Sequence, residues 1–260
     1  MNAHPGDTLG TGGGDPARVA LVSDVHGNLP AFEAVLADIK DTGVDAIWNL
    51  GDLVGYGAQP DECVALARET CDLCLIGNHD LVVIDRLDVD DFSANAATAA
   101  LWTRDNISAE TRDFLTPLEP KDESHGEIGL YHASPRDPVW EYVLSTGLAH
   151  ACIDAMPGRI GAVGHSHVAL WFWRQEGGRT TGEQATHGLE VDMSSGEWLI
   201  NPGGVGQPRD GDPRAAWILL DVERSSAQWR RVEYSIDAAA KAIEDAGLPR
   251  SLADRLYFGQ

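Results

Sequence analysis

Three short apolar runs alternate with two helical stretches in the first third of the chain, and no other feature restricts the fold as strongly. Each run ends in polar residues, which is typical of a buried strand. Each helical stretch opens at a proline, and the first one stops at Gly43. Strand, helix, strand, helix, strand at this spacing predicts the βαβ units of a mostly parallel sheet. The strands are expected at 19–22, 44–50 and 73–76, and the helices at 30–42 and 60–70.

The rest of the chain has a different pattern, with an alanine-rich helical region at 90–118 followed by short strands between turns. No internal repeat occurs, and no linker interrupts the chain after residue 17. We therefore expect a flexible leader at 1–17 and one layered α/β domain at 18–260, with antiparallel sheet edges. The later strands are expected at 128–132, 160–164, 168–173, 198–200, 217–222 and 228–234, and a closing helix at 237–246.

The charge balance limits the partners of this chain. There are 19 Lys and Arg residues against 41 Asp and Glu, a formal net charge of −22. Such a surface repels phosphate backbones, which disfavours binding to a nucleic-acid duplex or an anionic membrane. The sequence has no apolar run long enough for a transmembrane helix, no apolar block at its start, and only four cysteines. These features predict a cytoplasmic protein without a disulfide framework.

Polar side chains follow strand after strand of the expected sheet, where ligands bind in open α/β folds. Taken alone, each histidine there is best explained as a hydrogen-bonded loop residue. Together, these imidazoles, carboxylates and one amide are ligands suited to manganese, iron or zinc. The set is too large for one tetrahedral ion and fits two ions that share a carboxylate. It comprises Asp24, His26, Asp52, Asn78, His132, His165 and His167, with His79 beside Asn78.

Five ordered segments of this set resemble the motif blocks of the calcineurin-like metallophosphoesterase superfamily. They are Asp24-Val25-His26, Gly51-Asp52, Gly77-Asn78-His79-Asp80, His132 and Gly164-His165-Ser166-His167. The segment Asn201-Pro202-Gly203-Gly204-Val205-Gly206-Gln207-Pro208-Arg209 is similar to the NPGSxGxPR segment of its small bacterial and archaeal phosphodiesterases, with Gly204 in place of the usual serine. The resemblance implies a four-layer α/β/β/α sandwich, with two mixed sheets face to face and helices outside.

The same resemblance implies a role for each matching residue. Two divalent metal ions would be bound, with manganese favoured over iron or zinc. Asp24, His26 and His167 would hold the first ion, and Asn78, His132 and His165 would hold the second. Asp52 would bridge the two ions, and a metal-bridging hydroxide would attack the phosphorus atom. His79 would contact the scissile phosphate, stabilising charge or protonating the leaving oxygen, unless it is only a structural neighbour of Asn78.

Departures from the family pattern restrict the classes of substrate that are expected. Protein phosphatases of the superfamily carry an Asp-Arg pair after the second block, where this chain has Gly55 and Tyr56. This difference favours a phosphodiester substrate over a phosphoprotein, because the chain has no arginine here to donate two parallel hydrogen bonds to a dianionic phosphate. Tyr56 is expected either to line the substrate pocket or to pack within its loop. Arg136 and Arg209 are candidates for phosphate binding, or for pairing with nearby acids, and Trp140 and Tyr142 for an aromatic wall or for core packing.

The function expected from these features is a metal-dependent phosphodiesterase acting on a small phosphate ester. Phosphomonoesterase, protein-phosphatase-like or nucleotide hydrolase activity is the alternative within the same class. A nuclease is disfavoured by the acidic surface. The alternative from another class is a non-catalytic metal-binding scaffold, which the complete set of candidate ligands disfavours. The sequence does not specify the substrate, the native metal or the oligomeric state.

Overall fold

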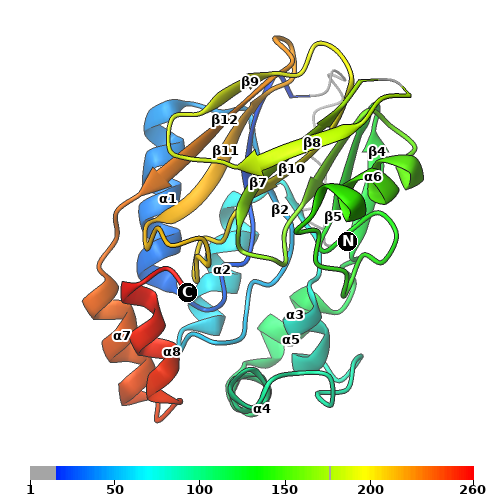
Figure 1. Ribbon diagram of the computed structural model, residues 1–260. Coiled ribbons are helices and arrows are strands. Elements are labelled where there is room, and N and C mark those ends of the chain that lie inside the picture. Colours follow the sequence, from blue (N-terminus) through cyan, green and yellow to red (C-terminus); the bar gives the residue numbers. More distant parts are fainter. Residues whose placement is uncertain (1–15, 176) are drawn as a thin grey trace, which may run out of the picture.

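The computed structural model describes residues 16–175 and 177–260, and most of the leader expected at 1–17 lies outside these ranges. The described chain contains two six-stranded sheets with helices around them (Figure 1). None of the described helices is both long and apolar enough to cross a membrane.

The first sheet is built on the expected βαβ units. Strand β1 (Arg18–Val22) lies parallel to β2 (Ala46–Asn49), which in turn lies parallel to β3 (Leu73–Cys74). Three antiparallel strands complete it in the order β3-β2-β1-β11-β12-β9. They are β11 (Ala215–Asp221), β12 (Ser226–Val232) and β9 (Glu190–Asp192). The sheet is therefore mixed, because strands from the end of the chain add antiparallel to a parallel start.

The second sheet has parallel strands at its centre and antiparallel strands at its edges. Its order is β4-β5-β6-β10-β7-β8. Strands β5 (Ile128–Tyr131), β6 (Ile160–Val163) and β10 (Glu197–Pro202) run parallel. The edges are β4 (Lys121–His125) on one side and β7 (Ala169–Arg174) with β8 (Thr180–Gln184) on the other.

Strict alternation along the strands produces the layers. In β1, Val19 and Leu21 pack into the core between the two sheets, whereas Ala20 and Val22 pack against the helices outside. The outer layer on this side is α1 (Leu29–Thr42) and α2 (Pro60–Thr70), and α6 (Thr146–Ala155) covers the second sheet. Each buried Val or Leu contributes roughly 1.5–3 kcal/mol relative to exposure. This arrangement is the expected four-layer sandwich.

A third group of helices lies below the two sheets in Figure 1. It consists of α3 (Asn78–Val83), α4 (Ala94–Asn106), α5 (Ala109–Leu115), α7 (Ile236–Asp245), α8 (Arg250–Asp254) and the 3₁₀ turn η1 (Arg255–Tyr257). Leu252 and Leu256 share a small apolar cluster with Tyr56, so the end of the chain lies against the loop after β2.

Several elements differ from the sequence expectation. The helical region expected at 90–118 is two helices, because the Ser108 side chain accepts a hydrogen bond from the Thr111 amide and starts α5 anew. The strand expected at 73–76 ends at Cys74, since the Ile76 amide bonds to Glu119 instead of continuing the ladder. Strands β4, β8 and β9 and helices α3, α6 and α8 were not expected.

Candidate active site

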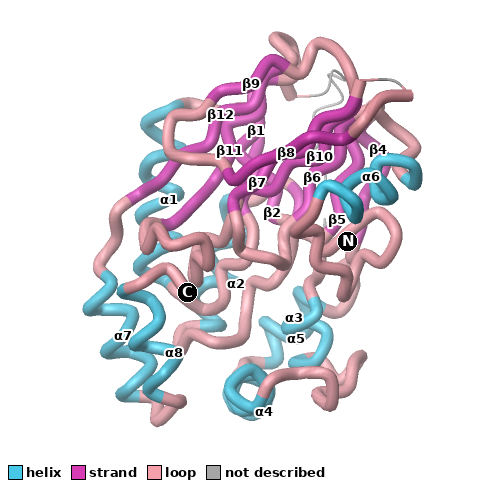
Figure 2. Tube along the Cα trace, viewed as in Figure 1, coloured by secondary structure: helices cyan, strands magenta, loops and turns pink. Residues whose placement is uncertain are grey.

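The candidate ligands lie on loops at the carboxyl ends of strands from both sheets. Figure 2 shows these loops gathered between the sheets and the lower helices. Asp24 and His26 follow β1, Asp52 follows β2, and Asn78 begins α3 just after β3. His132 follows β5, while His165 and His167 follow β6. All seven side chains are buried, so the site is enclosed where the two sheets meet.

The backbone at this site is strained in a way that aims side chains inward. Eight non-glycine residues in the described chain have positive φ, and six of them belong to these loops. Left-handed backbone is costly for residues other than glycine, so it persists only where the surrounding structure enforces it. Such clustering of strain is characteristic of functional sites. The six residues are Asp24, His26, Asp52, Tyr56, His165 and His167.

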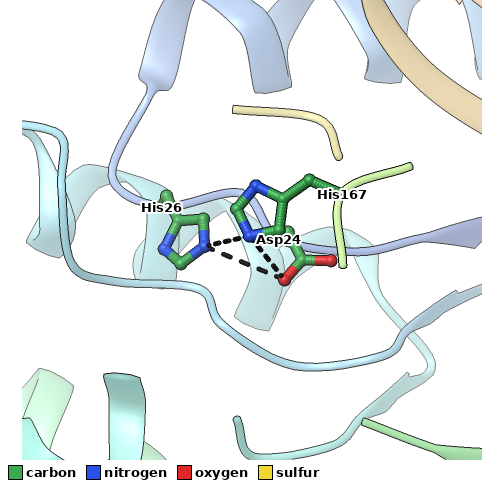
Figure 3. A group of neighbouring side chains, drawn as sticks. All are labelled: Asp24, His26 and His167. Atoms are coloured by element: carbon green, nitrogen blue, oxygen red, sulfur yellow. Dashed lines mark hydrogen bonds and ion pairs between the residues drawn. The ribbon is translucent and has the colours of Figure 1, made fainter. Parts of the chain in front are cut away.

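Asp24, His26 and His167 form one compact cluster (Figure 3). The Nε2 atoms of His26 and His167 lie 3.1 Å apart. Asp24 Oδ1 lies 3.3 Å from His167 Nε2 and 3.8 Å from His26 Nε2. Three donor atoms that converge this closely can bind one divalent cation.

Asp52 lies between this cluster and a second one. Its Oδ2 atom is 3.6 Å from His26 Nε2 and also 3.6 Å from His132 Nε2. Asp52, His132 and His165 offer atoms within 4.8 Å of one another, and His132 Nε2 lies 3.1 Å from Asn78 Oδ1. The carboxylate of Asp52 is thus placed to be shared by two neighbouring sites.

Backbone carbonyl groups orient the imidazole rings. The Nδ1 atoms of His26, His132 and His167 lie 3.0, 2.9 and 2.6 Å from the carbonyl oxygens of Val54, Leu50 and Gln207, respectively. With Nδ1 donating to a carbonyl, the unprotonated Nε2 atom of each ring faces the centre of the site. Histidines that bind metals in proteins are usually held in this way, with one ring nitrogen bonded to a carbonyl group and the other free for the metal.

Each carboxylate likewise keeps one oxygen for the centre of the site. Asp24 Oδ2 accepts a hydrogen bond from the His165 amide at 3.0 Å, and Asp52 Oδ1 accepts one from the His79 amide at 2.9 Å. Asp24 Oδ1, Asp52 Oδ2 and His165 Nε2 are buried without a hydrogen-bond partner among the described residues. An unpaired buried polar atom costs about 1–3 kcal/mol, and three such acceptor atoms facing one centre fit a bound cation.

The electrostatics of the site also fit a cation. Burial raises the pKa of Asp24 to about 7 and raises the pKa of Asp52 well above its usual value. Burial also lowers the pKa of His26, His165 and His167 well below the ordinary range. The raised pKa values mean that the carboxylates ionise with difficulty, because the neighbouring imidazoles are neutral and offer them no positive charge. Divalent metal ions would supply that charge. The donor set and its unpaired atoms therefore fit such ions.

Two glycines allow the side chains to approach this closely. A Cβ atom at Gly77 would lie 2.0 Å from Asp52 Oδ1, and one at Gly55 would lie 2.5 Å from His79 Nδ1. Gly55 also has a φ of +89°, where side chains are strained. Gly55 stands where protein phosphatases of the superfamily have the first residue of their Asp-Arg pair. A side chain at this position would collide with the ring of His79 as it is placed here.

His79 lies at the edge of the ligand cluster rather than apart from it. Its ring centroid is 4.8 Å from that of His26 and 4.4 Å from that of Tyr56, and one of its ring nitrogens groups with Asp52 and His26. Burial lowers the pKa of His79 well below its usual value. The neighbouring Asp80 accepts hydrogen bonds from the amides of Leu53, Val54 and Gly77, so its carboxylate holds the loop after Asp52.

The candidate substrate residues separate into two groups. Arg209 lies beside the site, with its guanidinium carbon 5.4 Å from the centroid of the Tyr56 ring. Arg136 pairs instead with Glu141 at 3.5 Å and is 43 % exposed, which matches the alternative of a surface ion pair. Tyr56 is buried against His26 and His79, so it both packs in its loop and borders the site.

Aromatic side chains surround the mouth of the site. Tyr142 is 44 % exposed and stacks on His165, with ring centroids 4.1 Å apart. Trp140 packs edge-on against Phe92, which in turn lies 4.5 Å from His79. Phe92 was not expected here, because it belongs to the connection between α3 and α4 and no local pattern distinguishes it.

Comparison with known proteins places this geometry in a family. Residues 18–225 match the model of the calcineurin-like phosphoesterase superfamily domain. The chain is 38 % identical to an uncharacterized protein from Methanocaldococcus jannaschii over 94 % of this chain and 99 % of the relative.

Solved structures agree with the family match. A metallophosphoesterase from Sphaerobacter thermophilus is 39 % identical and superposes with a TM-score of 0.84, covering 95 % of this chain and 100 % of its own. A hypothetical protein from Pyrococcus horikoshii, 21 % identical, shares the fold with a TM-score of 0.72 over 94 % of this chain and 98 % of its own. The chain belongs to the calcineurin-like phosphoesterase superfamily, as the order of its strand-end motifs predicts.

Proposed function

We propose that this protein hydrolyses small phosphodiesters with the aid of two divalent metal ions, and that manganese is favoured over iron or zinc. The observation that carries the proposal is the position of Asp52 Oδ2, which lies 3.6 Å from a histidine of each cluster and has no hydrogen-bond partner of its own. A buried carboxylate oxygen between two sets of neutral imidazoles is suited to bridge two cations.

The residues divide between the two ions as their positions suggest. Asp24, His26 and His167 would hold one ion, and Asn78, His132 and His165 would hold the other, with Asp52 shared. When bound, the ions would supply Lewis acidity to the phosphoryl group and lower the pKa of water at the site. The carbonyl groups of Leu50, Val54 and Gln207 would keep the rings in the binding tautomer.

Two further side chains would act on the substrate. His79 would contact the scissile phosphate from the edge of the cluster, where it could stabilise charge or protonate the leaving oxygen. Arg209 would bind a phosphate oxygen, because its guanidinium group lies over the ring of Tyr56 at the border of the site. Its positive charge lowers the pKa of both Asp24 and Asp52, as expected of a cation near the two carboxylates.

Preference for a diester follows from the number of cations around the substrate. Gly55 and Tyr56 occupy the places of the Asp-Arg pair of protein phosphatases, so no arginine stands at that position, and Arg209 is the arginine whose charge lowers the pKa of both Asp24 and Asp52. A diester carries one negative charge and requires less cationic grip than a dianionic monoester. The exposed ring of Tyr142 at the mouth would accommodate the second arm of the diester.

The proposal is tested with the purified protein after chelation and reconstitution with excess manganese. We expect two ions per chain, and a kcat/KM for bis-p-nitrophenyl phosphate above that for p-nitrophenyl phosphate and for a phosphoserine peptide. A faster reaction with the monoester or the peptide would overturn the diester preference. Metal binding without hydrolysis of any of the three would favour a non-catalytic scaffold.

A further inference from the structure

The segment 205–210, which follows β10, connects ligand loops of the two sheets. Its second residue donates a backbone hydrogen bond to the Asp24 carbonyl at 2.9 Å, on the loop after β1 of the first sheet. On the side of the second sheet, the Gln207 carbonyl oxygen lies 2.6 Å from His167 Nδ1, and the Arg209 amide donates to the His167 carbonyl at 3.1 Å. The segment therefore contacts two ligands of the first candidate ion that come from different sheets.

A buried ion pair anchors the end of this segment. Asp210 Oδ2 pairs with Arg231 Nη2 from β12 and also accepts a hydrogen bond from the Ala169 amide at 3.1 Å. Ala169 is the first residue of β7 and lies two residues after His167. The side chain of Asp210 is fully buried, and that of Arg231 is 2 % exposed. The pair thus ties the segment both to the strand that follows His167 and to a strand of the other sheet.

Stability alone does not explain an ion pair in this position. Because two charges lose their hydration on burial, the penalty can exceed their attraction, and apolar residues of similar volume are often as stable. Another ion pair on the same strand joins Arg174, at the far end of β7, to Glu197 at 2.8 Å. The Asp210–Arg231 pair differs from it in lying beside a candidate metal ligand.

We infer that the Asp210–Arg231 ion pair is a positioning element for the first metal site. It fixes the segment 205–210 so that the Gln207 carbonyl holds His167 in the tautomer protonated at Nδ1. The free Nε2 atom then faces Asp24 Oδ1, 3.3 Å away (Figure 3).

This role rests on the proposed function, because the ring is held for a metal ion. Asp210 and Arg231 act through the segment and not on the ion, so they are positioning residues. The second candidate site has a separate support, since His132 Nδ1 lies 2.9 Å from the Leu50 carbonyl oxygen. Loss of the ion pair should therefore weaken the first site and spare the second.

The first test needs neither metal nor turnover. In chelator, with nitrogen-15-labelled histidine, the ring-nitrogen chemical shifts of His167 in the wild type should be those of the Nδ1-protonated tautomer. Asp210→Asn keeps an oxygen acceptor for Ala169 but removes the charge, and it should produce a mixture of tautomers at His167 while His132 stays unchanged. Asp210→Asn combined with Arg231→Gln should do the same, and this double variant leaves no buried charge unpaired, so it should fold if the single variant does not.

Metal titration shows whether the effect is confined to one site. With manganese, the wild type should bind two ions, and in the double variant the affinity for one of them should fall by about 10–100-fold, as for other residues that orient metal ligands. With zinc as a diamagnetic probe, the His132 signals of the variant should respond at concentrations that leave those of His167 unchanged.

The other ion pair on β7 supplies a matched control. Arg174→Gln combined with Glu197→Gln removes the same two charges from the far end of the strand. It should preserve the His167 tautomer and both metal affinities, whatever its effect on the midpoint of thermal unfolding.

A wild-type tautomer with both affinities intact in the folded Asp210 and Arg231 variants would overturn the positioning role and leave the pair purely structural. An equal loss in the control would overturn it as well. If the variants disturbed His167 alone but the wild type hydrolysed no phosphate ester, the proposed function would fall and the positioning role would stand.

Discussion

The core between the two sheets and the ligand cluster at the strand ends are buried to the same degree but differ in how well their atoms are satisfied. Leu21 and Ile200 are fully buried and packed against apolar neighbours. Asp24 and Asp52 are as deeply buried, yet each has one carboxylate oxygen without a hydrogen-bond partner in the described chain. The core between the sheets stabilises the fold, whereas the ligand cluster destabilises it, because polar atoms are buried there without partners.

The largest expected effect separates the two roles within the cluster. His79→Asn should lower turnover by about 10²–10⁴-fold if His79 protonates the leaving group, and should leave the metal content near two ions. Asp52→Asn should lower the metal content itself, because the proposal has this carboxylate shared by both ions. Elemental analysis and initial rates on the same preparations distinguish these results. Loss of metal in the His79 variant would contradict the division of roles.

Removing apolar volume from the inter-sheet core should have the opposite signature. Leu21→Ala should lower the free energy of unfolding by about 2–5 kcal/mol, as expected for a large-to-small change in a packed core. Metal stoichiometry should stay at that of the wild type, because Leu21 points away from the ligand loops into the sheet interface. Denaturant unfolding and metal analysis test both statements. A core variant that lost its metal at unchanged stability would contradict the contrast between the regions.

The metal-free protein offers a smaller but more revealing test. Asp52→Asn should raise its free energy of unfolding at pH 8 by about 1–3 kcal/mol, because a buried carboxylate with a raised pKa is replaced by a neutral amide. The sign follows from linkage: a pKa raised by folding means that stability falls as the pH rises through the folded pKa. Thermal unfolding in excess chelator measures the change. A less stable variant would show that the carboxylate is satisfied without metal.

The smallest expected effect is on the pH dependence of metal binding. Burial raises the pKa of Asp24 to about 7, so protons compete with the metal below that pH. Manganese affinity should fall by about tenfold between pH 8 and pH 6 if Asp24 alone takes up the proton. Asp24→Asn should bind more weakly at pH 8 and lose most of that pH dependence. A wild-type affinity that is constant across this range would argue against Asp24 as a ligand.

The same contrast explains how much of the structure the sequence reveals. Strand-end motifs such as Asp24-Val25-His26 are local, so the polar cluster could be predicted from spacing and from the resemblance. The two-sheet architecture followed from that resemblance, whereas β8 and β9 were not expected because edge strands with Thr and Glu carry little apolar alternation.

Residues that reach the site only through tertiary packing could not be predicted from local sequence patterns. Phe92 approaches His79 from the connection after α3, and Leu256 reaches Tyr56 because the end of the chain docks by the Gly211–Gly259 hydrogen bond. Neither residue belongs to a motif. The pairing of Arg136 with Glu141 likewise depends on the fold of its loop, although an ion pair was one of the two expectations.

The most direct test of the central claim is anomalous diffraction from crystals of the manganese-loaded protein. We predict two peaks about 3.5–4 Å apart, one on each side of Asp52 Oδ2, the first beside His26 and His167 and the second beside His132 and His165. A single peak, or a second peak held by His79 in place of Asn78, would contradict the two-ion site that Asp52 bridges.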